Sequence, residues 1–177
     1  MIGKILIGLV VLVAALGVFI ATRPADFQIT RSAVLPAAPP VVFAQVNDLR
    51  KWEAWSPWAR LDPNSTATFS GPAVGQGSAM AWAGNNEVGE GKMTILESRP
   101  NEQIVMELEF LKPFEATNRT EFTFRPEAAG TRVTWTMSGS NNFMGKAMGL
   151  IMNCDKMIGD QFEQGLANMK TVVAATP

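Results

Sequence analysis

The pattern of hydrophobic and polar positions divides the chain into three parts. From Ile5 to Ala21 every residue is apolar or glycine. From Phe27 to about Ser138, apolar residues occupy alternate positions in a series of short runs. From about Asp155 to the carboxyl end they recur every three or four positions. In this order, the patterns are typical of a membrane-length helix, of strands with one buried face, and of an amphipathic helix.

The first segment predicts a membrane span. As a helix, Ile5 to Ala21 would rise about 26 Å, slightly less than the roughly 30 Å hydrocarbon core, and Lys4 and Arg23 can reach the interface at either end. A cleaved signal peptide is the alternative, but cleavage requires small residues where this segment has Val18, Phe19 and Ile20. We therefore interpret residues 1–25 as a transmembrane anchor with a short linker and residues 26–177 as a separate domain.

The second part predicts mainly strands. Phe27 to Leu35 forms one strand, and Pro39 and Pro40 suit the first turn of a helix through Val46. Six further strands follow, at 66–70, 78–83, 89–98, 104–110, around Phe122 and around Trp135. The turns between them are short enough for hairpins, which favours antiparallel pairing.

The last part predicts a long helix from about Asp155. One apolar stripe runs along it through Ile158, Phe162, Leu166, Met169 and Val173. A curved sheet can bury its concave face and this stripe together by wrapping around the helix. The sequence thus indicates an α+β, helix-grip fold of about seven strands, preceded by one transmembrane helix.

Composition excludes several classes of function. Lysine and arginine total 15 against 16 aspartate and glutamate residues, and no basic block is present, so nucleic acid is not expected as a partner. Histidine and tyrosine are absent and Cys154 is the only cysteine. We expect no metal and no cofactor, and no catalytic residue can be assigned from a motif. Glu107 and Glu109 should face solvent, whereas Asp155 and Asp160 could approach a cavity or simply cap the helix.

Several stretches carry a resemblance to a known superfamily. They are "DLRKWEAWSPW", "GPAVGQGSAMAWAGN", "VGEGKMTILESRPNEQI", "GTRVTWTMSG" and "GDQFEQGLANMK". With the order of elements, they resemble the START-like helix-grip superfamily, the SRPBCC group, and more narrowly bacterial polyketide cyclase/dehydrase-like proteins. The resemblance spans about Phe27 to Val173. It implies a seven-stranded sheet around the last helix, with a hydrophobic cavity between them. Some enzymes of the group use His, Tyr or a Rieske-type metal centre, and this chain has no His and no Tyr to match them.

The stretch "RKWEAWSPWARLDP" holds Trp52, Trp55 and Trp58 within seven positions. Pro57 disfavours a helical Ser56, so a helix from Asp48 should end near Trp55, and Trp58 should point from a loop. Three roles stay open for the rings: core packing, one mouth of the cavity, or insertion into a membrane surface. We assign Trp52 to the core.

The candidate ligand-binding residues are large apolar side chains at predicted inward positions or near the last helix. They are Trp55, Trp58, Trp82, Met93, Met106, Phe110, Phe122, Trp135, Met137, Phe143, Met148, Met152, Ile158 and Phe162. Methionine is adaptable, so a Met-rich lining would accept ligands of irregular shape, although a soft core would look the same.

These patterns and the resemblance favour a membrane-anchored domain that binds an apolar or amphipathic small molecule or lipid. One alternative is a cyclase or dehydratase acting on an apolar substrate, and another is a structural module with a packed core. Fold alone does not choose between them. We expect a single-pass protein of the bacterial inner membrane, with the domain on the outer, periplasmic face, as is usual for a short amino-terminal anchor. Ligand identity and oligomeric state do not follow from the sequence.

Overall fold

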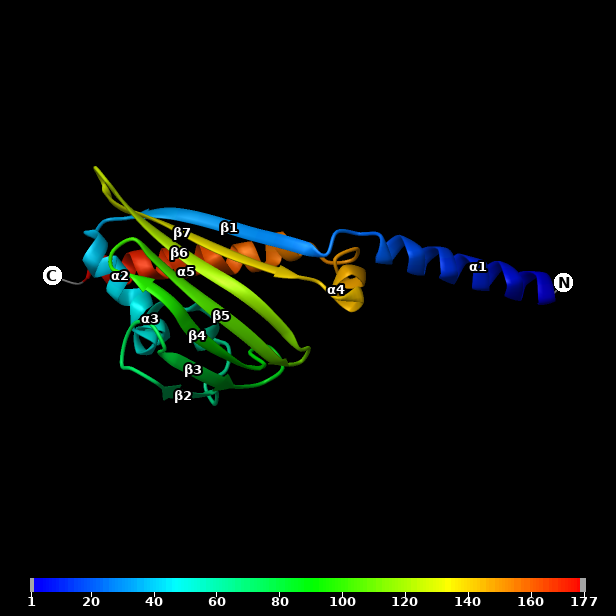
Figure 1. The fold of residues 1–177 in the computed structure, drawn as a ribbon, viewed down its shortest axis with the longest axis horizontal. Helices are drawn as coiled ribbons and strands as arrows, with labels where there is room; N and C mark the ends of the chain where they lie inside the picture. Colours follow the sequence, from blue (N-terminus) through cyan, green and yellow to red (C-terminus); the bar gives the residue numbers. More distant parts are fainter. Residues whose placement is uncertain (1, 176–177) are drawn as a thin grey trace.

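The computed structural model describes residues 2–175 (Figure 1). The helices are α1 (Ile2–Ala21), α2 (Pro39–Asn47), α3 (Trp52–Trp55), α4 (Phe143–Met148) and α5 (Cys154–Ala174), with short 3-10 turns η1 (Leu49–Lys51) and η2 (Pro57–Arg60). The strands are β1 (Asp26–Leu35), β2 (Thr66–Ser70), β3 (Ala79–Ala83), β4 (Glu90–Arg99), β5 (Gln103–Lys112), β6 (Ala116–Glu127) and β7 (Gly130–Ser140).

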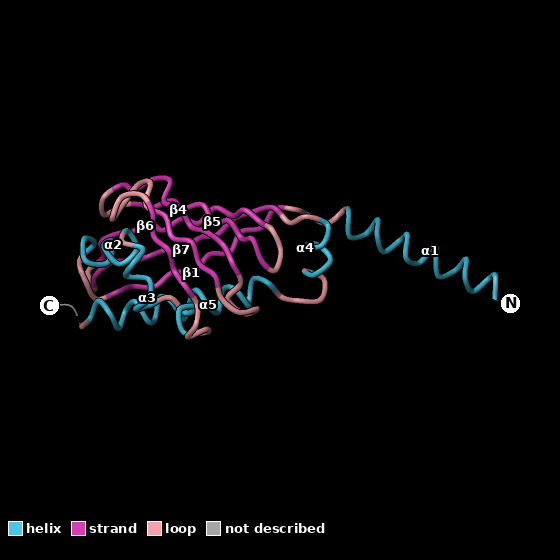
Figure 2. The backbone as a smooth tube through the Cα atoms, turned by 90° about the horizontal axis from the view of Figure 1, so that it is seen from below, coloured by secondary structure: helices cyan, strands magenta, loops and turns pink. Residues whose placement is uncertain are grey.

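The strands form one antiparallel sheet in the order β1-β7-β6-β5-β4-β3-β2. The sheet curves around α5, which runs along its concave face (Figures 1 and 2). The last strand, β7, lies between β6 and β1 and pairs with both. Its pairing with β1 places Ile29 opposite Met137. The predicted helix-grip architecture is confirmed, and the predicted strand boundaries agree with the structure to within a few residues.

The core fills the space between the concave face and α5. Trp135 on β7, Phe122 on β6 and Met106 on β5 are all buried there. Four members of the predicted helix stripe are buried as well, namely Phe162, Leu166, Met169 and Val173. Ile158, nearest the start of the helix, is only half-buried. The helix thus packs tightly along its carboxyl-terminal part and less tightly at its beginning.

α1 extends away from the domain (Figure 1). It begins a few residues before the predicted segment, and its apolar side chains are largely exposed, as at Ile7 and Leu12. Among residues 2–175 it is the one helix long and apolar enough to cross a membrane, and a signal sequence would share these features. Ile20 is the exception to this exposure, because the last turn of α1 lies against the domain.

One local expectation needs correction. Trp58 lies in the short helical turn η2 and not in a loop. Proline suits the first position of such a turn, and Pro57 begins this one. Between β7 and α5, where the sequence patterns above make no prediction, the structure has one further helix, α4. Its start is stabilised by the side chain of Asn142, which accepts a hydrogen bond from the backbone N–H of Gly145 at 2.9 Å.

Candidate functional site

A hollow of about 870 Å³ lies between the sheet and the first turns of α5, at the end of the domain nearest α1. We call it the α4 hollow. Its apolar lining comes from β1, the β5–β6 hairpin, β7, α4, the α4–α5 loop and α5. These residues are Phe27, Ile29, Phe110, Phe114, Ala116, Met137, Met144, Met148, Leu150, Ile151, Met152 and Ile158.

The α4 hollow arises because the sheet splits at this end. The β6–β7 ladder has its last pair at Asn118 and Gly139, whereas β5 and β6 stay paired as far as Phe110 and Ala116. Gly139 is needed at the split, because a Cβ at this position would overlap the Asn118 side chain. Beyond it the β5–β6 hairpin separates from β1 and β7, and α4 with the α4–α5 loop covers part of the gap.

Few charged groups line the α4 hollow. Glu115 is exposed at the tip of the β5–β6 hairpin, and Asp155 lies in the first turn of α5. Asp155 is engaged by Arg31 of β1, whose Nη2 lies 3.1 Å from Asp155 Oδ2. The Nε of Arg31 also donates to Glu163 Oε1 at 2.9 Å. These bonds, that to Asp155 foremost, raise the pKa of Arg31 above its ordinary value.

The other end of the space between sheet and α5 is filled by aromatic rings. Trp135 stacks on Phe162 with ring centroids 4.0 Å apart, and the ring of Trp55 lies 5.7 Å from that of Trp135. Trp52 and Phe122 complete the packing on the side of Trp55. Trp52, Trp55, Phe122, Trp135 and Phe162 of this aromatic cluster are buried in the core, and Trp58 is half-buried beside them.

Trp52 and Trp55 also complete the hydrogen bonding of α2. The last carbonyl groups of a helix have no partner within it. Here the Trp55 Nε1 donates to the carbonyl of Gln45 and the Trp52 Nε1 to that of Val46, both at 3.1 Å. Trp55 is 0% exposed. The two rings therefore attach α2 to the core, as predicted for Trp52.

The structure separates the candidate ligand-binding residues into two groups. Five line the α4 hollow: Phe110, Met137, Met148, Met152 and Ile158. Trp55, Trp58, Met93, Met106, Phe122, Trp135 and Phe162 belong to the packed core or lie against it. Trp82 packs edge-on against Phe110, and Phe143 is exposed on α4. These nine residues do not line the α4 hollow: seven are packed in or against the core, Trp82 lies against Phe110, and Phe143 is exposed.

Sequence reasoning missed several lining residues. Phe27 and Ile29 alternate with polar residues in the first strand, so the same signal that selected Met137 was available for them. Leu150, Ile151 and Cys154 carried no such signal, since they lie in a loop or at its end, where no periodicity indicates which way a side chain points.

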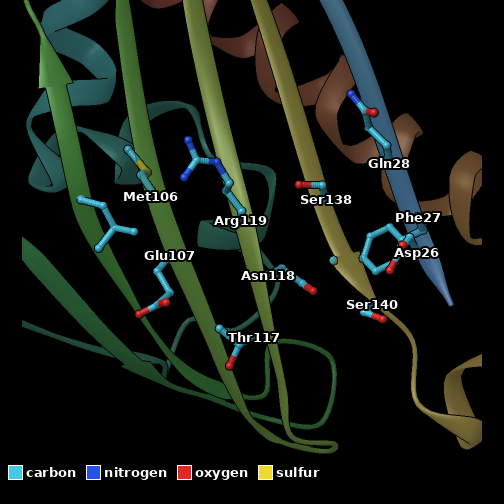
Figure 3. Close-up of a pocket in the computed structure, with 12 residues that line it drawn as sticks. Asp26, Phe27, Gln28, Met106, Glu107, Thr117, Asn118, Arg119, Ser138 and Ser140 are labelled. Atoms are coloured by element: carbon cyan, nitrogen blue, oxygen red, sulfur yellow. The ribbon is translucent and has the colours of Figure 1, made fainter.

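A second hollow, of about 740 Å³, lies on the outer side of the split (Figure 3). Its lining is more polar and includes Arg119 and Ser138. Met106, one of the candidate ligand-binding residues, also lines it. Phe27, Gln28, Asn118 and Ser140 line both hollows. The split therefore brings polar groups of the outer face close to the apolar lining of the α4 hollow. Within residues 2–175, no cluster of three or more His, Cys, Asp or Glu side chains could hold a metal ion.

Three solved structures illustrate how widely this fold occurs. A protein from Mesorhizobium loti has a TM-score of 0.63 at 13% identity, covering 85% of this chain and 99% of its own. The solution structure of the Aha1 dimer from Colwellia psychrerythraea has a TM-score of 0.60 at 15% identity, with coverages of 83% and 96%. DynU16, a protein in the dynemicin biosynthetic locus, has a TM-score of 0.58 at 13% identity, with coverages of 84% and 47%.

The comparison with curated proteins gave no match. A family model, in contrast, matches residues 26–174, which run from the first strand to the end of α5. That family is described as polyketide cyclase/dehydrase and lipid transport. The match includes every strand of the sheet and the helix that it grips. The chain therefore belongs to the polyketide cyclase/dehydrase and lipid transport family.

Proposed function

We propose that this protein is a membrane-anchored binding domain for a lipid or another amphipathic molecule, whose apolar part occupies the α4 hollow. The observation that carries the proposal is the hollow itself, which is lined mainly by apolar side chains. Its volume of about 870 Å³ falls within the range of roughly 300–1,000 Å³ typical of small-molecule sites.

The chemistry of the lining favours an apolar chain. Met137, Met148 and Met152 are unbranched and adapt to irregular shapes, whereas Phe27 and Ile29 form a fixed apolar floor. Asn118 and Ser140 lie at the split, where a polar head could hydrogen-bond and remain in contact with water. An amphipathic ligand matches this combination better than a wholly polar or wholly apolar one.

The anchor supports a lipid as the ligand. α1 has the length and composition of a membrane span, and only four residues separate it from β1. A domain so close to a bilayer meets lipids at high local concentration. We place it in the inner membrane of a bacterium with the domain on the outer, periplasmic side, and a protease-protection assay on intact spheroplasts tests that side.

The experiment is to identify molecules retained by the full-length protein. The chain is extracted gently in nanodiscs or mild detergent, and native mass spectrometry measures the mass bound. The variant Ile158→Trp places a bulky ring in the α4 hollow, where it should obstruct the ligand and reduce the bound mass several-fold. Ala167→Trp, on the exposed side of the same helix, is the matched control and should retain it. If the wild-type domain is empty in lipid titrations as well, the proposal is wrong and a packed structural module remains.

A cyclase or dehydratase is the second candidate, since the family description names such enzymes and two carboxylates line the hollow. Their surroundings argue against it. Asp155 is paired with Arg31, and Glu115 is exposed to solvent, so neither carboxylate is a buried, unpaired group facing the apolar lining, as a general acid or base for an apolar substrate would be. If Glu115→Gln or Asp155→Asn protein retained molecules differing from those of the wild type by one water, the enzyme would be the better interpretation.

A further inference from the structure

The end of the domain beside α1 has an unusual surface. Phe143 and Met144 of α4 are 54% and 56% exposed, and Ile151 in the following loop is 89% exposed. Leu150 and Met152 are exposed as well. We call these residues the α4 surface: Phe143, Met144, Leu150, Ile151 and Met152. Single exposed apolar residues are common, but five within ten positions form a contiguous patch of the kind that marks an interaction site.

The α4 surface has a fixed position relative to the end of α1. The Nζ of Lys146 donates to the carbonyl of Ala21 at 3.1 Å, and the backbone N–H of Asn141 donates to the carbonyl of Ala25 at 2.8 Å. Ile20 is buried at this junction. Figures 1 and 2 agree in placing α4 beside the carboxyl end of α1. If α1 spans a bilayer, α4 lies at the level where the hydrocarbon ends.

Charge favours a membrane as the occupant of this surface over an acidic or mixed-charge protein. No Asp or Glu occurs between Ser140 and Asp155, and the charged residue of this segment is Lys146. Arg23, at the junction, packs its guanidinium over the Phe19 ring at 4.2 Å. Two carboxylates also line the hollow, and one of them, Asp155, is paired with Arg31, which leaves Glu115 at the hairpin tip. An apolar segment whose one charge is a cation, with Arg23 beside it, is typical of surfaces that bind the headgroup region of anionic bilayers.

We propose that the α4 surface inserts into the membrane interface, so that the mouth of the α4 hollow opens directly onto the lipid. Met144, Leu150, Ile151 and Met152 line the hollow and belong to the inserted surface at the same time. A lipid could then move from bilayer to hollow without crossing water. This uptake route rests on the proposed function, whereas the insertion of α4 does not.

The depth of the α4 surface is tested with a fluorescent label on the full chain. In a Cys154→Ser background, Ile151→Cys is labelled with an environment-sensitive dye and the protein is placed in nanodiscs of phosphatidylcholine and phosphatidylglycerol. The matched control is Ala129→Cys in the β6–β7 turn, at the opposite end of the sheet and roughly 30 Å away along β1. Spin-labelled lipids should quench the label at 151 several-fold more strongly than the label at 129, and aqueous iodide should do the reverse.

Two results would overturn the insertion. Equal access of iodide to both labels would show that the α4 surface stays in water. Protection of the label at 151 from both quenchers would show that protein covers it, either a second copy of this chain or another partner. Failure of the chain to incorporate into nanodiscs at all would instead contradict the anchor.

The uptake route has its own test. Phe143→Asp changes a residue of the α4 surface that does not line the hollow. It should slow the transfer of a fluorescent phosphatidylcholine from vesicles by several-fold and leave the amount bound at equilibrium nearly unchanged. Val74→Asp, another exposed apolar position away from α4, is the control and should transfer at the wild-type rate. An unchanged rate in Phe143→Asp protein would exclude the route. If the wild type bound no lipid at all, the proposed function would be contradicted, but the quenching measured for the label at position 151 would still test the insertion.

Discussion

The guanidinium group of Arg31 lies directly over Gly159. Arg31 projects from β1 toward α5, where its Nη2 donates to both the carboxylate and the backbone carbonyl of Asp155 at 3.1 Å, and its Nε reaches Glu163. A Cβ on residue 159 would overlap the guanidinium. Because residue 159 has no side chain, Arg31 can lie across α5 there and bond to both Asp155 and Glu163.

This relationship predicts that Gly159→Ala destabilises the protein, contrary to the usual effect of alanine in a helix. Alanine in the middle of a helix is normally favoured over glycine by about 1 kcal/mol. At position 159 the methyl group would displace Arg31 from Asp155 and Glu163, and this loss should exceed the gain. The free energy of unfolding of both proteins, measured by denaturant titration, checks the sign.

The double variant provides the control. In an Arg31→Ala background the three atoms nearest to the added methyl group are gone, so Gly159→Ala should become stabilising by about 1 kcal/mol. The change of sign between the two backgrounds measures the coupling directly. A destabilisation of the same size in both would show that the methyl group collides with something other than Arg31.

The aromatic cluster predicts a difference between two matched substitutions. Trp55 and Trp135 are 0% and 2% exposed. Phenylalanine at either position would replace the indole by a smaller ring without an N–H group. The Nε1 of Trp55 donates to the carbonyl of Gln45, whereas the Nε1 of Trp135 is buried without a partner in the described structure. Leaving a buried acceptor unpaired costs about 1–3 kcal/mol. Trp55→Phe should therefore cost more than Trp135→Phe by about that amount.

Thermal and denaturant unfolding of the two variants measure this difference. The mass of ligand bound per folded molecule should be the same in both, because neither ring lines the α4 hollow. A Trp55→Phe protein that is as stable as the wild type but has lost its ligand would restore the interpretation of Trp55 as a binding residue.

Sequence periodicity predicted the architecture well, because strands and helices repeat the same environment at fixed spacing. The spacing from Phe162 to Val173 predicted the buried stripe of α5. Alternation predicted the burial of Ile104 and Met106 on β5, although Val105 between them is buried as well. Periodicity also selected Met137 and Ile158, which line the α4 hollow. Periodicity could not predict where the space between sheet and helix is filled by side chains and where it stays open. Trp135 and Met137 have the same alternation, yet one lies in the aromatic cluster and the other at the hollow.

The remaining features depend on contacts between segments far apart in the chain. The split in the sheet follows from where the β6–β7 ladder ends at Asn118, and no local signal marks that residue. The position of α4 depends on its contact with the end of α1, through Lys146 and Ala21. Neither could be predicted from periodicity, and together they determine where the α4 hollow opens.

A buried carboxylate organises the loops that flank the short strands β2 and β3. Asp62 is 7% exposed and accepts hydrogen bonds from the backbone N–H groups of Asn64, at 2.9 Å, and Asn85, at 2.7 Å. Asp62→Ala leaves both donors without this acceptor and should lower the free energy of unfolding by about 1–3 kcal/mol. Asp48→Ala is the comparison, since Asp48 accepts one such bond in a more exposed position and should cost less. Equal losses in the two variants would contradict the assigned role of Asp62.

Cys154 offers a reporter of ligand binding that needs no added cysteine. It is the only cysteine of the chain, it is partly buried, and it lines the α4 hollow at the start of α5. A ligand in the hollow would cover the thiol, so saturation with lipid should slow its reaction with a maleimide by several-fold. In Ile158→Trp protein the tryptophan occupies the hollow, so the rate should no longer depend on added lipid. A rate independent of lipid in the wild type, under conditions where native mass spectrometry detects bound lipid, would place the ligand outside the α4 hollow.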